Sequence, residues 1–251
     1  MPTRRKREWF DNDAFWRDTY SFMFPDTRLN AAKNEVDKII RLTKVKKGAA
    51  LDLCCGPGRC TVALAIRRFV VTGVDRTKFL LDKARARARA AKVKIEFIQK
   101  DMRDFVRPDT YDLVLSMFTS FGYFQNRNED LAVLRNLHTS MRTGGSLVID
   151  VIGKERLAKI FLATSSEELP DGSLLVERRE VVEDWTRIRN EWIVIRKRRA
   201  KSHKFDLNLY SAQELRDLME RAGFVRVKLY GDFDGHPYGR DSLRLIAVGR
   251  K

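Results

Sequence analysis

The sequence has few cysteines and no arrangement of them that sets a class of protein. Its 251 residues include only three, Cys54, Cys55 and Cys60, all within one short stretch. Such a set does not form a disulfide framework, and no Cys-x-x-Cys or His-x-x-x-His spacing supports a metal site. We therefore expect small buried side chains here, with no metal.

Long apolar runs are also missing. No stretch approaches the roughly 20 apolar residues that a membrane helix requires. The basic residues Arg4 to Arg7 precede the polar and aromatic segment Glu8 to Asp11, so the apolar run of a secretory leader is absent. These absences lead us to expect a cytoplasmic protein with no membrane partner.

Acidic residues are the minority: 34 Asp and Glu stand against 50 Lys and Arg, a formal net charge of +16. Such an excess is compatible with an anionic partner, including nucleic acid. The basic clusters are spread along the chain, however, and no aromatic residues interleave with them as in an RNA-reading sheet. A nucleic-acid partner is thus possible but not favoured.

What the sequence does contain begins at Ala49. The apolar run Ala49 to Leu53 predicts a buried strand, Gly56 to Gly58 a tight turn, and Thr61 to Ile66 a helix. A strand, a glycine-rich turn and a helix bring backbone close to a ligand at the helix N-terminus. Val70 to Asp75 then predicts a second strand, which ends in a carboxylate able to accept hydrogen bonds from both hydroxyls of a ribose.

This order of residues resembles the class I S-adenosylmethionine (SAM)-dependent methyltransferases. The likeness rests on Asp52-x-x-x-Gly56-x-Gly58 with Asp75 ending the next strand, and extends through the segments 100–103, 112–124 and 141–150. The Thr-Ser-Phe-Gly-Tyr-Phe segment after the fourth strand looks like one small-molecule group of that family. Two positions depart from the pattern, because Cys54 and Cys60 stand where the family carries glycine.

The resemblance implies an α/β fold, with a Rossmann-like class I methyltransferase sheet that has helices on both faces. Residues 155–210 break the alternation of strand and helix, since three successive segments have strand character, and we expect an antiparallel β insertion there. The predicted organisation is a lid segment at 1–28, a SAM-binding core at 29–154, the insertion as a cap at 155–210, and a final helix with a closing strand pair at 211–251. A dimer interface is the alternative use of the insertion.

The resemblance also implies SAM as the cofactor. Asp75 would hold the ribose hydroxyls, Asp101 the adenine amino group, and Met102 would pack on the ring; an alternative for Asp101 is a helix N-cap. Tyr20 and Arg28 are candidates for the lid. The complete set of expected cofactor-binding residues is Asp52, Cys54, Gly56, Pro57, Gly58, Asp75, Arg76, Asp101, Met102, Met117, Tyr20 and Arg28.

The methyl group of SAM is already activated, so the protein must hold the acceptor atom in line and exclude water. A nitrogen, oxygen or carbon acceptor can require a base. The candidates are His203, Tyr210, Tyr123 and His236, of which we take the last two as the predicted catalytic residues. A lone histidine is more often structural, which applies to both histidines.

The predicted function is methyl transfer from SAM to a small-molecule acceptor, by a monomer or homodimer. The alternatives are an RNA methyltransferase, an NAD-dependent oxidoreductase on a Rossmann core, and a non-catalytic nucleic-acid-binding relative. Asp52 ahead of the turn and Asp101-Met102 argue against the oxidoreductase, and the intact Gly56, Gly58 and Asp75 argue against a non-catalytic relative.

Overall fold

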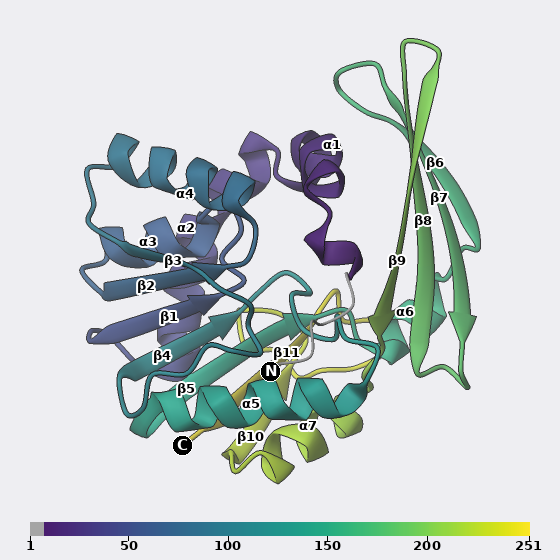
Figure 1. The fold of residues 1–251 in the computed structure, drawn as a ribbon. Helices are drawn as coiled ribbons and strands as arrows, with labels where there is room; N and C mark the ends of the chain where they lie inside the picture. The colour runs from purple at the N-terminus through teal and green to yellow at the C-terminus, as the bar shows by residue number, and fades with distance from the viewer. Residues whose placement is uncertain (1–7) are drawn as a thin grey trace, which may run out of the picture.

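The structure, a computed structural model, describes residues 8–251 and contains two β-sheets (Figure 1). The larger is a 7-stranded sheet of order β10-β11-β5-β4-β1-β2-β3. Strands β1 to β5 run parallel, and β11 pairs antiparallel with both β5 and β10. The strands are β1 (Ala49–Leu53), β2 (Val70–Asp75), β3 (Glu96–Gln99), β4 (Tyr111–Ser116), β5 (Met141–Val151), β10 (Val225–Tyr230) and β11 (Leu245–Arg250). The predicted Rossmann-like sheet is confirmed.

Helices cover both faces of this sheet because the central strands are apolar on both sides. Ala50 of β1 packs with Val36 and Leu64, whereas the adjacent Leu51 belongs to a cluster with Leu134 on the opposite face. The helices are α2 (Asp26–Thr43), α3 (Arg59–Ile66), α4 (Lys78–Ala90), α5 (Arg127–Ser140) and α7 (Ala212–Arg221). Helices α2 and α3 lie on one face, and α5 and α7 lie on the other (Figure 1).

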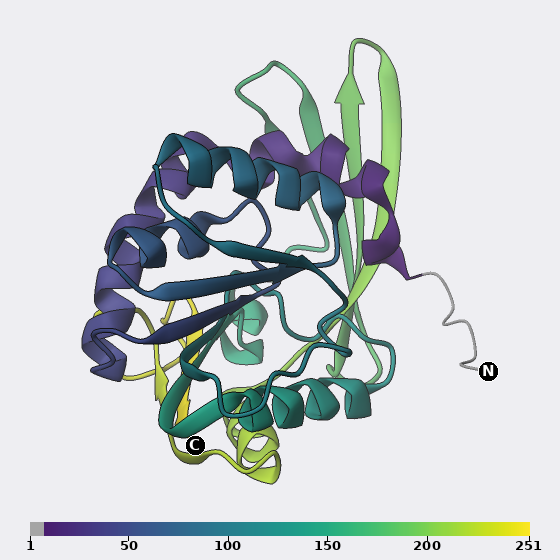
Figure 2. The same cartoon turned by 60° about the vertical axis from the view of Figure 1, so that its left-hand side comes forward.

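The smaller sheet has four antiparallel strands in the order β6-β7-β8-β9, which confirms the predicted antiparallel insertion. Helix α6 (Lys154–Ile160) leads into β6 (Thr164–Glu168), β7 (Leu174–Val182), β8 (Arg187–Arg196) and β9 (Arg199–Asn208). The sheet stands beside the core, and the β8–β9 hairpin projects beyond it (Figures 1 and 2). Both α6 and β6 were missed by the sequence prediction.

The N-terminal aromatic segment lies between the two sheets. The short helix η1 (Trp9–Asp11) precedes α1 (Asp13–Met23). The Phe15 ring stacks on Trp192 of β8, with ring centroids 6.0 Å apart, and also contacts Phe205 of β9. Residues 1–7 of the expected lid segment lie outside the described residues.

The beginning of β5 is irregular. The strand starts at Met141, which pairs with Tyr111, and continues through Gly144 and Gly145 to Val151. An irregularity in the β4–β5 pairing absorbs the two glycines, and Gly144 takes a φ of 82°. Among the helices of residues 8–251, none combines the length and the apolar character needed to span a bilayer.

Candidate functional site

The turn after β1 follows the predicted path. Gly56 and Gly58 both have positive φ, and a Cβ on Gly58 would lie 2.9 Å from that of Ala84. Glycine is therefore required at position 58 for both conformation and space. Cys54 also has a positive φ, 58°, although it is not glycine. Cys54 thus holds a left-handed conformation that glycine adopts with less strain.

Asp75 closes this turn from the end of β2. Its Oδ2 accepts a hydrogen bond from the Gly56 N–H at 2.8 Å, and its Oδ1 accepts one from the Thr77 N–H at 2.8 Å. Burial raises the pKa of the Asp75 carboxyl, while the backbone donors act in the opposite direction. The carboxylate therefore joins the turns after β1 and β2, and each oxygen keeps acceptor capacity for a further donor.

Asp52, within β1, is buried deeper. Its Oδ2 accepts from the Thr61 hydroxyl at 2.5 Å, which ties β1 to the first turns of α3. Burial raises its pKa to about 6, against the opposing effects of Thr61 and Arg59. A carboxyl with this pKa changes charge within a unit or two of neutral pH.

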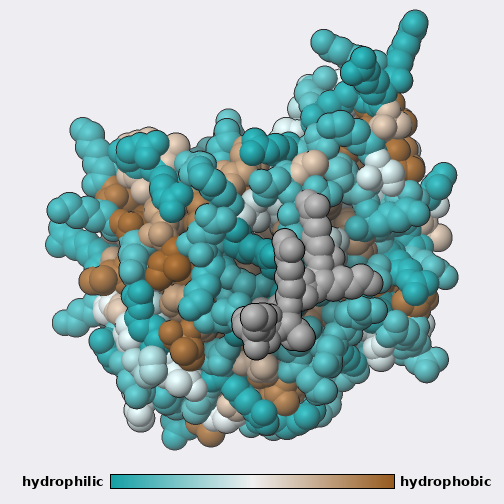
Figure 3. Space-filling view, in the orientation of Figure 1, coloured by the Kyte–Doolittle hydropathy of each residue, from teal (hydrophilic) through white to brown (hydrophobic). Residues whose placement is uncertain are grey.

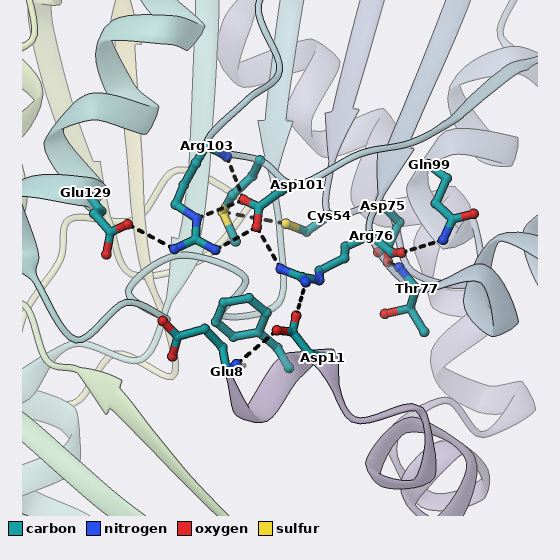
Figure 4. A network of polar contacts seen from close by, with 12 residues as sticks. Glu8, Asp11, Cys54, Asp75, Arg76, Thr77, Gln99, Asp101, Arg103 and Glu129 are labelled. Carbon is teal, nitrogen blue, oxygen red and sulfur yellow. Dashed lines mark hydrogen bonds and ion pairs between the residues drawn. The ribbon is translucent and has the colours of Figure 1, made fainter. Parts of the chain in front are cut away.

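A network of charged groups connects the end of β3 to the N-terminal segment (Figure 4). Asp101 pairs with Arg103 at 2.7 Å and with Arg76 at 2.8 Å, and Arg76 also pairs with Asp11 of η1. Burial opposes ionisation of Asp101, but the Arg103 hydrogen bonds prevail and lower its pKa. Its Oδ1 also accepts from the Arg103 N–H at 2.9 Å, so Asp101 caps a short turn.

These groups surround one cavity, which we call the first cavity. Most of the predicted cofactor-binding residues line it: Asp52, Cys54, Gly56, Pro57, Asp75, Arg76, Asp101, Met102 and Met117. Tyr123, predicted as catalytic, lines it as well. The structure therefore brings together side chains from the ends of β1, β2, β3 and β4 at one edge of the sheet.

The sequence prediction missed part of this lining. Phe10, Trp16, Met23 and Phe24 come from the N-terminal segment and cover the cavity, and Phe118 follows β4. The expected lid at 1–28 included this segment, but only Tyr20 and Arg28 were named within it. The Arg76–Asp11 ion pair and the Arg76 guanidinium over the Phe10 ring place η1 over the ends of β2 and β3.

Three predicted residues lie elsewhere. Gly58 packs against Ala84 behind the turn. Tyr20 contacts Phe79 and Phe24 on the outer side of α1. The His236 side chain is 74% exposed, hydrogen-bonds Asp232 at 2.6 Å, and lines neither this cavity nor the next one described. The Asp232 hydrogen bond raises the pKa of His236.

A second cavity of about 630 Å³ opens beside the first. Trp16, Met23, Phe118 and Tyr123 line both. The other walls come from α1, from the inner face of the smaller sheet and from the loop after β4. They are rich in apolar and aromatic side chains, including Phe15, Phe121, Leu175, Ile188, Trp192, Phe205 and Leu207. The volume is suited to a small organic molecule.

A buried polar network lies where the two sheets meet. Asp130 of α5 accepts from the Tyr210 hydroxyl at 2.6 Å and from the Asn208 side-chain N–H at 2.7 Å. Burial raises the pKa of Asp130 to about 6. Tyr210 and Asn208 line the second cavity. Asp130 was missed because an acid in the first turn of a helix ordinarily complements the helix dipole.

Three arginines surround the Phe118 ring at the junction of the cavities. The guanidinium carbons of Arg28, Arg59 and Arg244 lie 4.6, 5.7 and 6.0 Å from its centroid. Arg59 pairs with Glu35 and Arg244 with Asp150, whereas the hydrogen bonds of Arg28 go to backbone oxygens of Phe22 and Met23. Burial, together with repulsion from the other two cations, lowers the pKa of Arg28. Arg28 lines the second cavity rather than the first.

The described part of the chain contains no metal site, because no group of three or more His, Cys, Asp or Glu side chains in it is placed to hold an ion. The three cysteines are unpaired, and burial raises the pKa of each thiol.

Comparison with known proteins agrees with this geometry. Residues 50–145 match the sequence model of the family described as "Methyltransferase domain". YqeM of Bacillus subtilis (strain 168), which its name describes as a methyltransferase, is 27% identical over 143 residues, or 57% of this chain and 58% of that protein. This chain thus spans little more than half the length of that relative.

Solved structures extend the likeness to most of the chain. The CcbJ methyltransferase from Streptomyces caelestis superposes with a TM-score of 0.75 at 18% identity, over 88% of this chain and 89% of that one. SAM-bound CalS10, an amino pentose methyltransferase from Micromonospora echinaspora, gives 0.68 at 20% identity over 100% of both chains. The fold is therefore that of the class I methyltransferases.

Proposed function

We propose that this protein transfers a methyl group from SAM to a small-molecule acceptor. The observation that carries the proposal is the convergence of Asp75, Asp101 and the Gly56–Gly58 turn on one cavity that continues into a second, larger one. The matched family model and the fold of the neighbours support it.

The residues of the first cavity are suited to the parts of SAM. Asp75 would accept from the ribose hydroxyls with the lone pairs that Gly56 and Thr77 leave free. Asp101, held ionised by Arg103, would accept from the adenine amino group, and Met102 would pack on the ring. Arg28 lies outside the first cavity, beside Phe118 at the junction with the second, and would bind the carboxylate of the methionine part from there. Its charge has no carboxylate partner within hydrogen-bonding distance in residues 8–251.

When bound, SAM supplies a methyl group that is already activated on a sulfonium. The protein's own part is to position the acceptor and to exclude water. Tyr123 borders both cavities, and burial raises the pKa of its hydroxyl, so it stays protonated near neutral pH. Tyr123 would therefore donate a hydrogen bond to the acceptor rather than remove its proton. His236 is too exposed, and too far from the lining of either cavity, to share this role.

The walls of the second cavity give the acceptor its character. The apolar side chains of β7, β8 and β9 would cover the body of the acceptor, and Asn190, Asn208 and Tyr210 offer polar groups to orient it. The inner face of the smaller sheet thus serves as the cap. The alternative, a dimer interface, would then have to use the outer face.

The test has two parts. Titration calorimetry with SAM and with NAD asks which cofactor binds, and micromolar SAM binding with no NAD binding is expected. Incubation with methyl-labelled SAM and pools of metabolites or total RNA then asks where the label goes. Label in a small molecule is expected. NAD binding without SAM binding would overturn the cofactor assignment, and label only in RNA would overturn the acceptor class.

A further inference from the structure

The turn of the β8–β9 hairpin carries residue types that are unusual for its backbone conformation. It consists of Lys197 and Arg198, with φ values of 45° and 64°. Two-residue hairpin turns with positive φ at both positions strongly favour Asn-Gly or Asp-Gly, because larger side chains are strained there. Two long basic side chains therefore occupy strained positions at the most projecting point of the sheet (Figure 1). Strain of this kind is commonly retained for a function.

The charges at this tip are not neutralised by the protein. Lys197, Arg198 and Arg199 are exposed, and their side chains form no hydrogen bond or ion pair within residues 8–251. No Asp or Glu occurs from Trp192 to Phe205. Lys201, further down β9, instead pairs with Asp18 of α1 at 2.9 Å. The hairpin is thus anchored to α1 below its tip, and the tip itself presents uncompensated positive charge.

The outer face of the sheet beside this tip carries a block of aliphatic side chains, bordered by Glu168 across from Leu174 and by Ser202 across from Ile193. Cross-strand register aligns Leu174 with Ile195 and Val176 with Ile193, and Ile195 with Ala200. These side chains alternate with the residues that line the second cavity, so they point to the other face. None of them packs against a buried apolar cluster, and Leu174 is 38% exposed. Figure 3 shows apolar side chains directly beneath the hydrophilic end of the projecting hairpin.

We propose that the tip of the β8–β9 hairpin and this apolar outer face dock on an anionic lipid bilayer. A lipid surface offers negative headgroups for the basic tip and an apolar interior for the aliphatic side chains. Nucleic acid would satisfy the charges but offers no apolar surface for the aliphatic block to bury against. A second copy of the chain would cover the block but bring together two proteins of net charge +16.

A sheet face that contacts a membrane does not produce the long apolar run that marks a membrane helix in a sequence. A membrane helix reads as a long apolar run, whereas a sheet face contributes only every second residue of each strand. The expectation of no membrane partner rested on the absence of such a run. Contact with the surface of a bilayer does not depend on the identity of the methyl acceptor.

The test is co-sedimentation with vesicles of phosphatidylcholine alone and of phosphatidylcholine mixed with phosphatidylglycerol. We expect wild type to bind only the mixed vesicles, and Lys197→Ala, Arg198→Ala, Arg199→Ala combined to weaken binding about tenfold or more. Ile193→Ser with Ile195→Ser should weaken it several-fold. The control is Lys46→Ala, Lys47→Ala, Lys94→Ala, which removes the same charge from exposed positions elsewhere and should retain wild-type binding.

Circular dichroism and SAM binding verify that each variant is folded. Failure of wild type to bind mixed vesicles at low salt would overturn the proposal, as would an equal loss in the control variant. A labelled single-stranded RNA is the competing probe. RNA binding that needs the tip charges but not Ile193 and Ile195, with no vesicle binding, would assign the surface to nucleic acid instead. If the wild-type protein does not bind SAM, the proposed function is contradicted, but the vesicle result is unaffected.

Discussion

The two sheets contribute to the two cavities in different ways. In the larger sheet the site is built from strand ends: Asp75 ends β2, Asp101 follows β3, and the Gly56–Gly58 turn follows β1. In the smaller sheet the cavity wall is the side of the strands, where every second residue of β7, β8 and β9 faces inward. A strand end is marked in the sequence by a turn or a carboxylate, whereas a strand side is marked only by alternation. A cofactor site can thus be read locally, while an acceptor site depends on register.

The largest expected effect concerns Asp75, which belongs to the cofactor site at the strand ends of the larger sheet. Asp75→Ala should reduce SAM affinity at least about a hundredfold, because two charge-assisted hydrogen bonds of about 1.5–3 kcal/mol each would be lost. Calorimetric titration with SAM measures the change, and circular dichroism shows whether the fold is intact. The substitution also removes both acceptors of the Gly56 and Thr77 N–H groups, so the companion variant is Asp75→Asn, which keeps one of the two oxygens. SAM binding by Asp75→Ala at wild-type affinity would disprove the ribose assignment.

The buried polar network around Asp130, where the two sheets meet, can be tested through the pH dependence of stability. Burial gives Asp130 a folded pKa of about 6, above the value near 3.9 of an unfolded chain. The folded state therefore holds this proton more tightly, and the contribution of Asp130 to stability is greatest below pH 4 and declines as the pH rises to 6. Asp130→Asn should remove a decline of up to about 3 kcal/mol in the free energy of unfolding.

Urea unfolding of wild type and Asp130→Asn between pH 4 and pH 7 measures this difference. Other carboxylates titrate equally in both proteins, so the comparison isolates Asp130. Identical pH profiles for the two proteins would show that Asp130 titrates normally in the folded state. The Tyr210 and Asn208 hydrogen bonds would then keep it ionised despite its burial.

Filling the second cavity should separate acceptor binding from cofactor binding. Leu175→Trp adds bulk to the inner face of β7, and methyl transfer to the acceptor found by the labelling screen should fall about tenfold or more. SAM affinity should stay within about twofold, since Leu175 does not line the first cavity. Glu180→Trp, on the outer face of the same strand, is the matched control. An equal loss of SAM affinity and transfer would mean that the two cavities act as one site.

The smallest expected effect concerns the N-terminal cover. Asp11→Asn removes an ion pair with Arg76 while Arg76 keeps its partner Asp101. Because partly exposed ion pairs contribute at most about 1 kcal/mol, SAM should dissociate only about threefold faster. Stopped-flow measurement of SAM release gives the rate. A dissociation rate unchanged by the substitution would show that η1 does not hold the cofactor in place.

The order of elements and most of the first cavity were predictable because they depend on neighbours in sequence. The Asp52-to-Gly58 motif, Asp75 and Asp101-Met102 each sit at a strand end that the apolar pattern marks. The second cavity was predictable only as a region, since its walls depend on the register of β7 to β9 and on packing of α1 against them.

Misplaced residues have a physical reason in common. Tyr20 and His236 were assigned from residue type and from their place in a family pattern, without any local signal of where the side chain would point. In the structure, Tyr20 faces α4 through Phe79, and the loop turns His236 toward Asp232. A helix face or an irregular loop does not reveal its orientation until its partner elements are placed.

We proposed that the smaller sheet caps the acceptor, and one contact limits how freely such a cap can be exchanged among relatives. The Asn208 N–H donates to the Gly122 carbonyl oxygen at 2.6 Å, and a Cβ on Gly122 would lie 2.9 Å from the Asn208 carbonyl oxygen. The loop after β4 and the end of β9 are therefore fitted backbone to backbone, with no side-chain space to absorb a mismatch. Transplanting a foreign cap to change the acceptor would need to move residues 118–130 together with 155–210 as one inherited unit.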